Sequence, residues 1–497
     1  MAGTENGGNA ALEKHASASP ALPQARQDIV DDEHEADRHG QMLAGGIRVK
    51  TAGESGRRGI HPLHFFRIIW MSSSKISRAV NILWPFVPAA LAVYYTNVGS
   101  PALRFSLSYI AMVPCANLIG FSGAELARKM PHMLGVLTET TIGSIVEIIL
   151  FLVLLLQKDA HGEENADPEE NPRFLIIRAA ILGSILATML LCLGLCFFVA
   201  GLRRTTATFD AAISEVGSGL LLMAGLGLAI PTIFGHTISP AKYGITDMEL
   251  YLKTTQLSRV VAVLLLIAYV VFIWFQMSSH HSIYDAVFEH DEKRDHDKHK
   301  DAAKAKLTLT ECVVALAVSV ALVTLIALAL VSEIEPLVEA SGISDPFMGL
   351  ILVPLVEKAA EHLTALDEAW DNQINFALSH CIGSTIQTAM LNAPLVIIVA
   401  WGRGISLNLN FEIFEIAILI LAIITVGNYL RDQKSDYLEG FLCVITYIAI
   451  AVAAFYFPTL PVLQGGGHEG GGEGAAAGAS GGHGEGGHAE RSLFMGM

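Results

Sequence analysis

The sequence predicts an all-α integral membrane protein of about eleven transmembrane helices, with one leading helix followed by two inverted five-helix repeats. Three observations lead to this fold class. The chain of 497 residues is 52% hydrophobic and 16% charged, with a mean hydropathy of +0.48, whereas soluble domains carry about 25% charged residues. It contains apolar runs that reach the roughly 20 residues needed to span a bilayer. It also carries one short pattern of glycine, hydroxyl and glutamate residues twice.

The apolar runs follow one another along most of the chain. The first is short and interrupted by Pro85 and Pro88. The predicted spans are 80–96, 105–122, 133–157, 174–200, 212–234, 255–277, 309–331, 346–366, 375–401, 411–429 and 437–457.

The polar stretches between and beyond these spans divide the chain into five parts. The first is rich in glycine, alanine and charge, which predicts disorder. The segment that separates the halves is charged and rich in histidine, and the end of the chain is rich in glycine and histidine. The parts are a disordered cytosolic tail (1–79), a leading helix with the first repeat half (80–277), a charged His-rich cytosolic loop (278–308), the second repeat half (309–458) and a disordered tail (459–497).

Basic residues predict how the helices are oriented. Arg57, Arg58 and Arg67 precede the first span and place the N-terminus in the cytosol, because cytoplasmic loops carry an excess of lysine and arginine. With eleven spans, the remaining basic loops also fall on the cytosolic side, and the acidic loop 159–170 falls on the opposite side. The C-terminus is then luminal, and the two halves have opposite topology.

Two glutamates are the expected centre of the site. Glu147 and Glu361 each lie inside an apolar helix, one in each half. A charge within a membrane helix costs a few kcal/mol and marks an ion or proton pathway. Inverted repeats bring such groups together near the bilayer midplane. We therefore expect both glutamates to bind a metal cation and, once it leaves, to take up protons instead.

Small and polar residues accompany each glutamate and complete the expected site. Glycines permit close helix approach, and hydroxyl and amide oxygens can complete the six to eight ligands that Ca²⁺ takes. The expected ion- or proton-binding residues besides the two glutamates are Thr140, Gly143, Ser144, Ser184, Glu357, Lys358, Ser384 and Gln387.

These residues resemble the calcium/proton exchanger family of the calcium/cation antiporter superfamily, including the fungal vacuolar cation/proton exchangers. The second half carries the most specific match, Ala359-Ala360-Glu361-His362 followed by Gly383-Ser384 and Gln387. The resemblance covers residues 80 to 458. It implies a sodium/calcium exchanger-like fold and a vacuolar-type membrane. It also implies a proton-coupled antiporter that moves Ca²⁺ into an acidic compartment in exchange for H⁺, by alternating access at the two-glutamate site.

Several residues depart from the family pattern. The family Gly-Asn before the second glutamate is Glu357-Lys358 here, the family Asn of the first repeat is Ser144, and a Ser-Asn pair is Ala187-Thr188. Lys358 lies three residues before Glu361 and shares its helix face, so its ammonium would subtract one positive charge from what the site accepts. A Na⁺/H⁺ or K⁺/H⁺ exchanger is therefore an alternative, and a transport-inactive scaffold is another. Candidate neighbours of the site are Thr188, Glu215, His362 and His380.

Other classes of function are less well supported by the sequence. The net charge of −16 lies mostly in loops and tails, and the absence of a basic patch with aromatic residues argues against a nucleic-acid partner. A membrane hydrolase built on Glu361, His362, Asp367 and Asp371 lacks the His-Glu-x-x-His metal motif, so we expect a secondary transporter and not an enzyme. The expected partners are lipid, inorganic cations and protons, without a cofactor. The oligomeric state stays open, and the six cysteines are expected to be packing residues.

Overall fold

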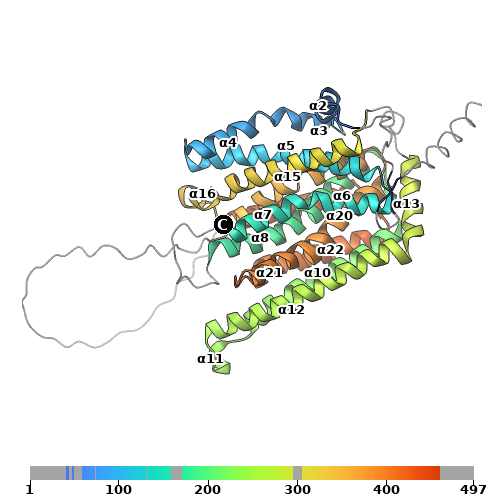
Figure 1. Ribbon diagram of the computed structural model, residues 1–497. Helices are drawn as coiled ribbons and strands as arrows, with labels where there is room; N and C mark the ends of the chain where they lie inside the picture. The colour runs from blue at the N-terminus through green and yellow to red at the C-terminus, as the bar shows by residue number, and fades with distance from the viewer. Residues whose placement is uncertain are drawn as a thin grey trace, which may run out of the picture. The chain divides into compact units, whose positions relative to one another are not determined.

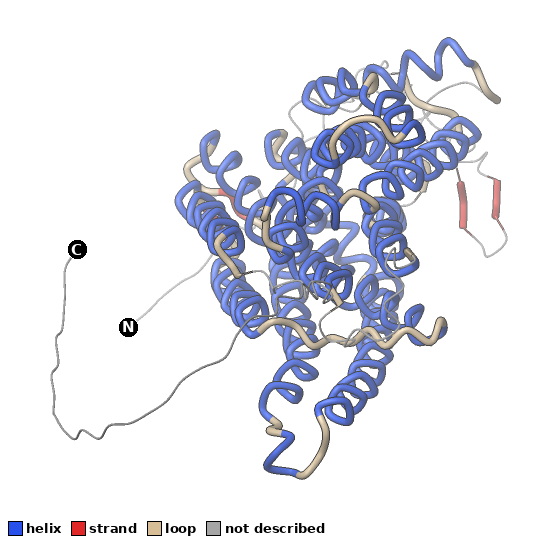
Figure 2. Tube along the Cα trace, turned by 90° about the vertical axis from the view of Figure 1, so that its left-hand side faces the viewer, coloured by secondary structure: helices blue, strands red, loops and turns tan. Residues whose placement is uncertain are grey.

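The computed structural model describes residues 41–43, 47–49, 59–72, 74–130, 132–157, 171–294 and 305–458. Within these ranges, ten helices are long and apolar enough to cross a membrane. The eleventh predicted span is an interrupted helix over residues 345–370. Figure 2 shows helix throughout the bundle, with strands limited to short segments. The all-α membrane fold is therefore confirmed.

The leading span is preceded by a short helix. Helix α2 (Pro62–Met71) comes first, followed by α3 (Lys75–Val80), a 3₁₀ turn η3 (Asn81–Leu83) and α4 (Phe86–Thr96). Ile68 of α2 is buried in a small apolar cluster with Phe121 and Leu307, which explains why this segment is ordered although its surroundings are polar. The predicted disordered tail thus extends too far, because 1–79 includes α2, α3 and the antiparallel strands β1 (Gln41–Leu43) and β2 (Ile47–Val49).

The first half contains five membrane-crossing segments. The second and third of them are interrupted, one by a kink and one by a π-helical turn. The elements are α5 (Pro101–Ala127), α6 (His132–Gly143), α7 (Ile145–Leu156), α8 (Pro172–Leu186), the π turn η4 (Ala187–Cys192), α9 (Leu193–Arg203), β3 (Ala207–Thr208), α10 (Ala211–Thr237), α11 (Pro240–Tyr243), α12 (Asp247–Trp274) and the π turn η5 (Phe275–Ser279).

The second half repeats this order of long and interrupted helices. Its strand β4 (Lys434–Ser435) pairs with β3 of the first half. The elements are α15 (Leu309–Val331), α16 (Ile334–Ser341), α17 (Asp345–Phe347), the π turn η6 (Met348–Leu352), α18 (Val353–Glu357), α19 (Ala359–Trp370), α20 (Ile374–Gln387), the π turn η7 (Thr388–Asn392), α21 (Ala393–Gly402), α22 (Ile413–Arg431), β4 and α23 (Tyr437–Phe455).

The segment between the halves forms an additional helix. Helix α13 (His281–Arg294) lies across one end of the bundle, where it packs against α20 and α6 (Figure 1). Tyr284, Val287, Phe288 and Asp291 are its buried residues, so this part of the predicted loop is a docked amphipathic helix. The glycine- and histidine-rich end of the chain, the acidic loop 159–170 and residues 295–304 lie outside the described residues.

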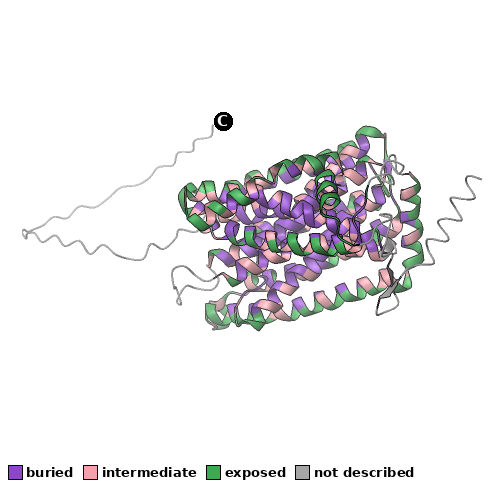
Figure 3. Cartoon of the chain, turned by 45° about the horizontal axis from the view of Figure 1, so that its top comes forward, coloured by how far each residue is buried: buried purple, intermediate pink, exposed green. Residues whose placement is uncertain are grey.

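The most buried elements come from both halves and lie in the middle of the bundle. Helices α5 and α15 pack side by side (Figure 1), and Figure 3 shows buried residues along the centre and exposed ones on the outer helices. Helix α8 approaches η6 so closely that a Cβ atom on Gly183 would lie 2.2 Å from the backbone oxygen of Leu350. A glycine at this position is therefore required for the two halves to meet.

Candidate functional site

Each half breaks one helix just before its key glutamate. Ser144 separates α6 from α7, and Lys358 separates α18 from α19. These breaks place Glu147 in the first turn of α7 and Glu361 in the first turn of α19. A carboxylate is stabilised there because the free N–H groups and the helix dipole favour negative charge. The breaks also expose backbone in the interior, which membrane proteins tolerate where it lines a cavity.

The ammonium group of Lys358 joins the two glutamates. Its Nζ lies 2.7 Å from Glu147 Oε2 and 3.2 Å from Glu361 Oε2, and it donates to Ser384 Oγ at 3.0 Å. An ammonium has three N–H donors, so each of them has an acceptor. Glu147 and Glu361 therefore lie within reach of one cationic centre, which is the position that Lys358 occupies.

Glu147 is held mainly by the second half. Its Oε2 accepts hydrogen bonds from Thr388 Oγ1 at 2.9 Å and from Asn392 Nδ2 at 2.8 Å. Thr388 and Asn392 were not among the residues predicted for the site. A signal was present, because Ser384, Thr388 and Asn392 recur at intervals of four residues on one helix, which places them on one face.

Two of the predicted polar residues connect the halves around these contacts, and a third binds Glu361 within its own half. Gln387 Nε2 donates to Ser144 Oγ at 2.9 Å, and Ser144 in turn donates to the Thr141 carbonyl at 3.0 Å. Ser384 donates to Glu361 Oε2 while it accepts from Lys358. A Cβ atom on Gly143 would lie 2.8 Å from Glu361 Oε1, so this glycine makes room for the carboxylate of the other half.

Glu357 is a third buried carboxylate beside this cluster. Its side chain is 1% exposed, and its charge interacts with those of Glu147 and Lys358. Its neighbouring hydroxyl is that of Ser184, which is fully buried. Three carboxylates and one ammonium leave two negative charges on the cluster when all four groups are ionised.

A cavity that is partly open to solvent lies next to Glu361. The side chain of Glu361 is 16% exposed, whereas that of Glu147 is 1% exposed. Thr140 and Thr188, which were also predicted for the site, line the cavity. Their hydroxyl groups do not bond to the glutamates but donate to backbone carbonyls of their own helices. The residues lining it are Gly120, Glu139, Thr140, Gly143, Thr188, Cys192, Ala360, Glu361, His362, Thr364, Ala365, His380, Cys381 and Ser384.

His380 belongs to a second polar group in this cavity. Its Nδ1 lies 2.7 Å from Glu368 Oε2, and its Nε2 lies 3.7 Å from Glu139 Oε2. Glu139 and Glu368 were not selected from the sequence, although Glu139 is a charged residue inside a predicted span. Glu215, by contrast, is exposed on α10 and lies outside the buried cluster.

Several buried oxygen atoms of the cluster lack a hydrogen-bond donor among the described residues. They include Glu147 Oε1, Gln387 Oε1, Asn392 Oδ1 and both carboxylate oxygens of Glu357. Buried polar atoms are usually satisfied, and carboxylate and amide oxygens are the ligands that hard cations prefer. Unsatisfied oxygens next to two carboxylates therefore suit a cation that exchanges places with the Lys358 ammonium.

The fold and this cluster define a membrane transporter built from two halves that share one buried site. The family model described as sodium/calcium exchanger protein matches residues 100–278 and 312–456, and the chain belongs to this family of secondary transporters. It is therefore a transporter and not an enzyme, and the resemblance seen in the sequence is confirmed.

Individual relatives agree with this assignment. The chain is 28% identical over 441 residues to "Vacuolar cation/proton exchanger 2" of Oryza sativa subsp. japonica, covering 88% of this chain and 92% of that protein. It is 29% identical to "Vacuolar calcium ion transporter" of Schizosaccharomyces pombe, covering 80% and 89%. The solved structure "Structure of native YfkE" superposes with a TM-score of 0.59 at 23% identity, over 76% of this chain and all of that one, which supports the fold.

Proposed function

We propose that this protein is a proton-coupled cation antiporter that moves Ca²⁺ into an acidic compartment such as the vacuole in exchange for H⁺. The observation that carries the proposal is the single ammonium contact shared by Glu147 and Glu361. A group with one positive charge already lies between carboxylates from opposite halves, so a transported cation would find its counter-charges in the same place. Relatives named as vacuolar calcium ion transporters and cation/proton exchangers support the choice of ions and membrane.

Exchange follows from competition for the same carboxylates. When Lys358 loses its proton or moves away, Glu147 and Glu361 are free to bind the cation together with the oxygens of Asn392 and Gln387. When the cation leaves, protons return to the lysine and the carboxylates, because isolated buried charges are costly. With Lys358 neutral or withdrawn, Glu147 and Glu361 themselves supply the two negative charges that match a divalent ion.

The cavity suggests which side of the membrane the site faces. It lies near Glu139, His380 and the first two turns of α19, on the side of the bundle where α13 packs against α6 and α20. We infer from the basic loops that this side is cytosolic, with a cytosolic N-terminus and a luminal C-terminus. This conformation then presents Glu361 to the cytosol, and the opposite state would present Glu147 to the lumen.

A monovalent cation is the second candidate, favoured by the direct contacts of Lys358. Lys358 contacts both Glu147 and Glu361 and neutralises one of their two negative charges. These three residues together carry a net charge of −1 when Glu357 does not take part. A Na⁺/H⁺ or K⁺/H⁺ exchanger would need no more than this charge.

Ion-resolved transport distinguishes these functions. The purified full-length chain is reconstituted into vesicles with an imposed pH gradient, and Ca²⁺, Na⁺ or K⁺ is added separately. We expect Ca²⁺ to dissipate the gradient. Dissipation by Na⁺ or K⁺ alone would select the monovalent exchanger, and failure of all three ions would select a transport-inactive scaffold.

A further inference from the structure

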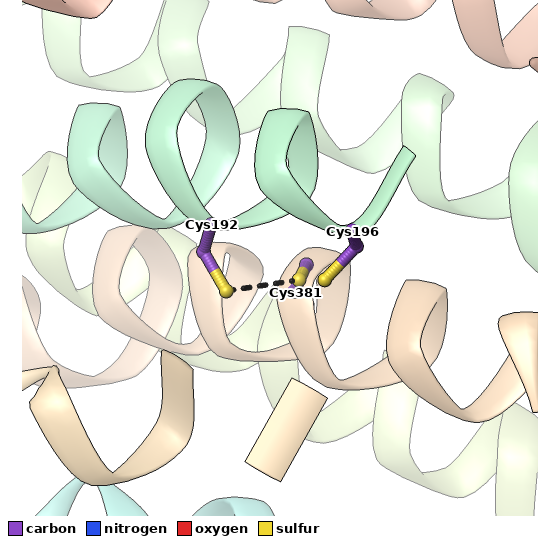
Figure 4. Close-up of side chains that lie close together, drawn as sticks. All are labelled: Cys192, Cys196 and Cys381. Atoms are coloured by element: carbon purple, nitrogen blue, oxygen red, sulfur yellow. Dashed lines mark hydrogen bonds between the residues drawn. The ribbon is translucent and has the colours of Figure 1, made fainter. Parts of the chain in front are cut away.

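Three cysteines lie together at the contact between the two halves. The Sγ atoms of Cys192, Cys196 and Cys381 all lie within 4.8 Å of one another, and all three residues are buried (Figure 4). Cys192 ends the π turn η4, Cys196 follows one turn later in α9, and Cys381 comes from α20 of the second half. The Sγ atoms of Cys192 and Cys381 are 3.5 Å apart.

The spacing of the sulfur atoms suits a metal ion held by three thiolates. A thiolate binds Zn²⁺ at about 2.3 Å, which places the sulfur atoms of one site roughly 4 Å apart. Cys192 and Cys196 face the same direction because residues four apart in a helix are neighbours. The other described cysteines, Cys115, Cys312 and Cys443, are also buried but do not belong to this group.

The cluster is reachable from the cavity that leads to Glu361. Cys192 and Cys381 line this cavity, and the Sγ atom of Cys196 lies within 4.8 Å of theirs. An ion that enters the cavity therefore meets two different kinds of ligand. The carboxylates select hard cations such as Ca²⁺, and the thiols select soft ones.

We propose that Cys192, Cys196 and Cys381 form a binding site for a soft, thiophilic cation such as Cd²⁺, and that the bound ion arrests exchange by linking the two halves. The thiols release their protons to solvent when the metal–sulfur bonds form, and no group is oxidised or reduced. Two ligands belong to the first half and one to the second. A bound ion thus opposes the relative movement of the halves that alternating access requires.

Binding is tested on the purified full-length protein by titration with Cd²⁺, followed through the ultraviolet charge-transfer absorption of cadmium–thiolate bonds. We expect about one Cd²⁺ per chain in the natural protein. Binding should weaken at least about tenfold in Cys196→Ser and Cys196→Ala, while the matched control Cys443→Ser is unchanged. No charge-transfer band in the natural protein, or an unchanged band in the triple variant Cys192→Ser/Cys196→Ser/Cys381→Ser, would overturn the proposal.

Arrest is tested separately by proton-driven Ca²⁺ uptake in vesicles. We expect Cd²⁺ to inhibit the natural protein and Cys443→Ser equally, and Cys196→Ser to need at least about tenfold more Cd²⁺. Equal inhibition of the natural protein, Cys443→Ser and Cys196→Ser would mean that Cd²⁺ acts at the carboxylates. It would contradict the proposal that Cd²⁺ bound to the three cysteines arrests exchange. The absorption titration does not require transport, so it remains decisive if the proposed Ca²⁺ exchange itself fails.

Discussion

The two halves of the protein hold equivalent glutamates in different surroundings. Glu147 of the first half is 1% exposed and accepts hydrogen bonds from Thr388 and Asn392 of the second half. Glu361 of the second half is 16% exposed and is bound by Ser384 and Lys358 of its own half. The duplicated sequence has therefore produced one enclosed carboxylate and one that faces a cavity.

The replaced residues explain part of this difference. Counted from the two Gly-Ser pairs, Thr188 and Cys192 occupy the positions of Thr388 and Asn392. Thr188 donates to the Ser184 carbonyl, and Cys192 contacts Cys381. The first half thus has no amide at the position equivalent to Asn392. Glu361 therefore lacks the hydrogen bond that Glu147 receives from Asn392. An inverted-repeat transporter needs such asymmetry in each state, because only one side of the site is open at a time.

The largest expected effect comes from removing either acid. Glu147→Gln and Glu361→Gln should each reduce exchange at least about a hundredfold, because an amide cannot alternate between a proton and a cation. Proton-driven ⁴⁵Ca²⁺ uptake in vesicles measures this, with Glu215→Gln as the control, since Glu215 is exposed outside the cluster. Uptake retained in one of the two variants would remove that glutamate from the mechanism.

Substitution of Gly183 and of Gly383, which precede Ser184 and Ser384, should affect stability differently. A Cβ atom on Gly183 would lie 2.2 Å from the Leu350 oxygen, whereas nothing lies within 4 Å of one on Gly383. We expect Gly183→Ala to destabilise the folded protein by about 2–4 kcal/mol, because overpacking forces the backbone apart. Gly383→Ala should be neutral or slightly stabilising, since alanine favours helix.

Thermal unfolding of the detergent-purified variants provides the measurement. Equal melting temperatures for Gly183→Ala and Gly383→Ala would show that α8 and η6 do not need their close contact.

The paired threonines test whether Glu147 depends on its donors. Thr388→Val removes a hydrogen bond to a carboxylate, while Thr188→Val removes one to a backbone carbonyl. Bonds to charged groups contribute about 1.5–3 kcal/mol, so exchange should fall about tenfold or more in Thr388→Val. Thr188→Val should change it less than about threefold. Initial rates of Ca²⁺ uptake compare the two variants, and similar losses would mean that the halves contribute alike.

The sequence predicted most of the fold because the length of each apolar run indicates a membrane span. It also predicted the central contacts, since Glu147, Lys358 and Glu361 are charges inside such spans. It did not predict Asn392 or Thr388 as partners of Glu147, because their position depends on how α20 and η7 cross α7. The π-helical turns, which change the direction that later residues face, have no comparable sequence signal. Helix α2 was overlooked because its buried partners lie far along the chain.

Lys358 has no equivalent in the first half, where Ser144 occupies the matching position before the acid. Lys358→Asn removes the ammonium from between Glu147 and Glu361 and supplies an oxygen donor. We expect selectivity for Ca²⁺ over Na⁺ and K⁺ to increase roughly threefold to tenfold, because the net charge of the cluster becomes more negative. Competition uptake assays measure it, and unchanged ion preference would show that Lys358 does not set the charge of the site.

The smallest expected effect concerns how the two equivalent helices α8 and α20 begin. In α8, the amide side chain of Asn171 accepts a hydrogen bond from Arg173 N at 3.1 Å. In α20, the carboxylate of Asp291 from α13 accepts from Asn375 N at 2.7 Å and from Asn375 Nδ2 at 2.9 Å. Of these two capping side chains, only that of Asp291 is titratable.

Burial raises the pKa of Asp291 above its ordinary value of 3.8. A raised pKa means that the docked helix binds the proton more tightly than the undocked one. The contribution of protonation to docking is therefore fully present below the ordinary pKa and is lost as the pH rises through the raised pKa. We expect the α13 amides to become less protected from exchange as the pH rises over this range.

Hydrogen exchange of the α13 amides, corrected for intrinsic rates, measures this change. Asp291→Asn should abolish the pH dependence while it keeps a side-chain oxygen that accepts from the backbone N–H of Asn375. A pH dependence that survives in Asp291→Asn would assign the titration to another group, and the two helix starts would then differ only in which element caps them.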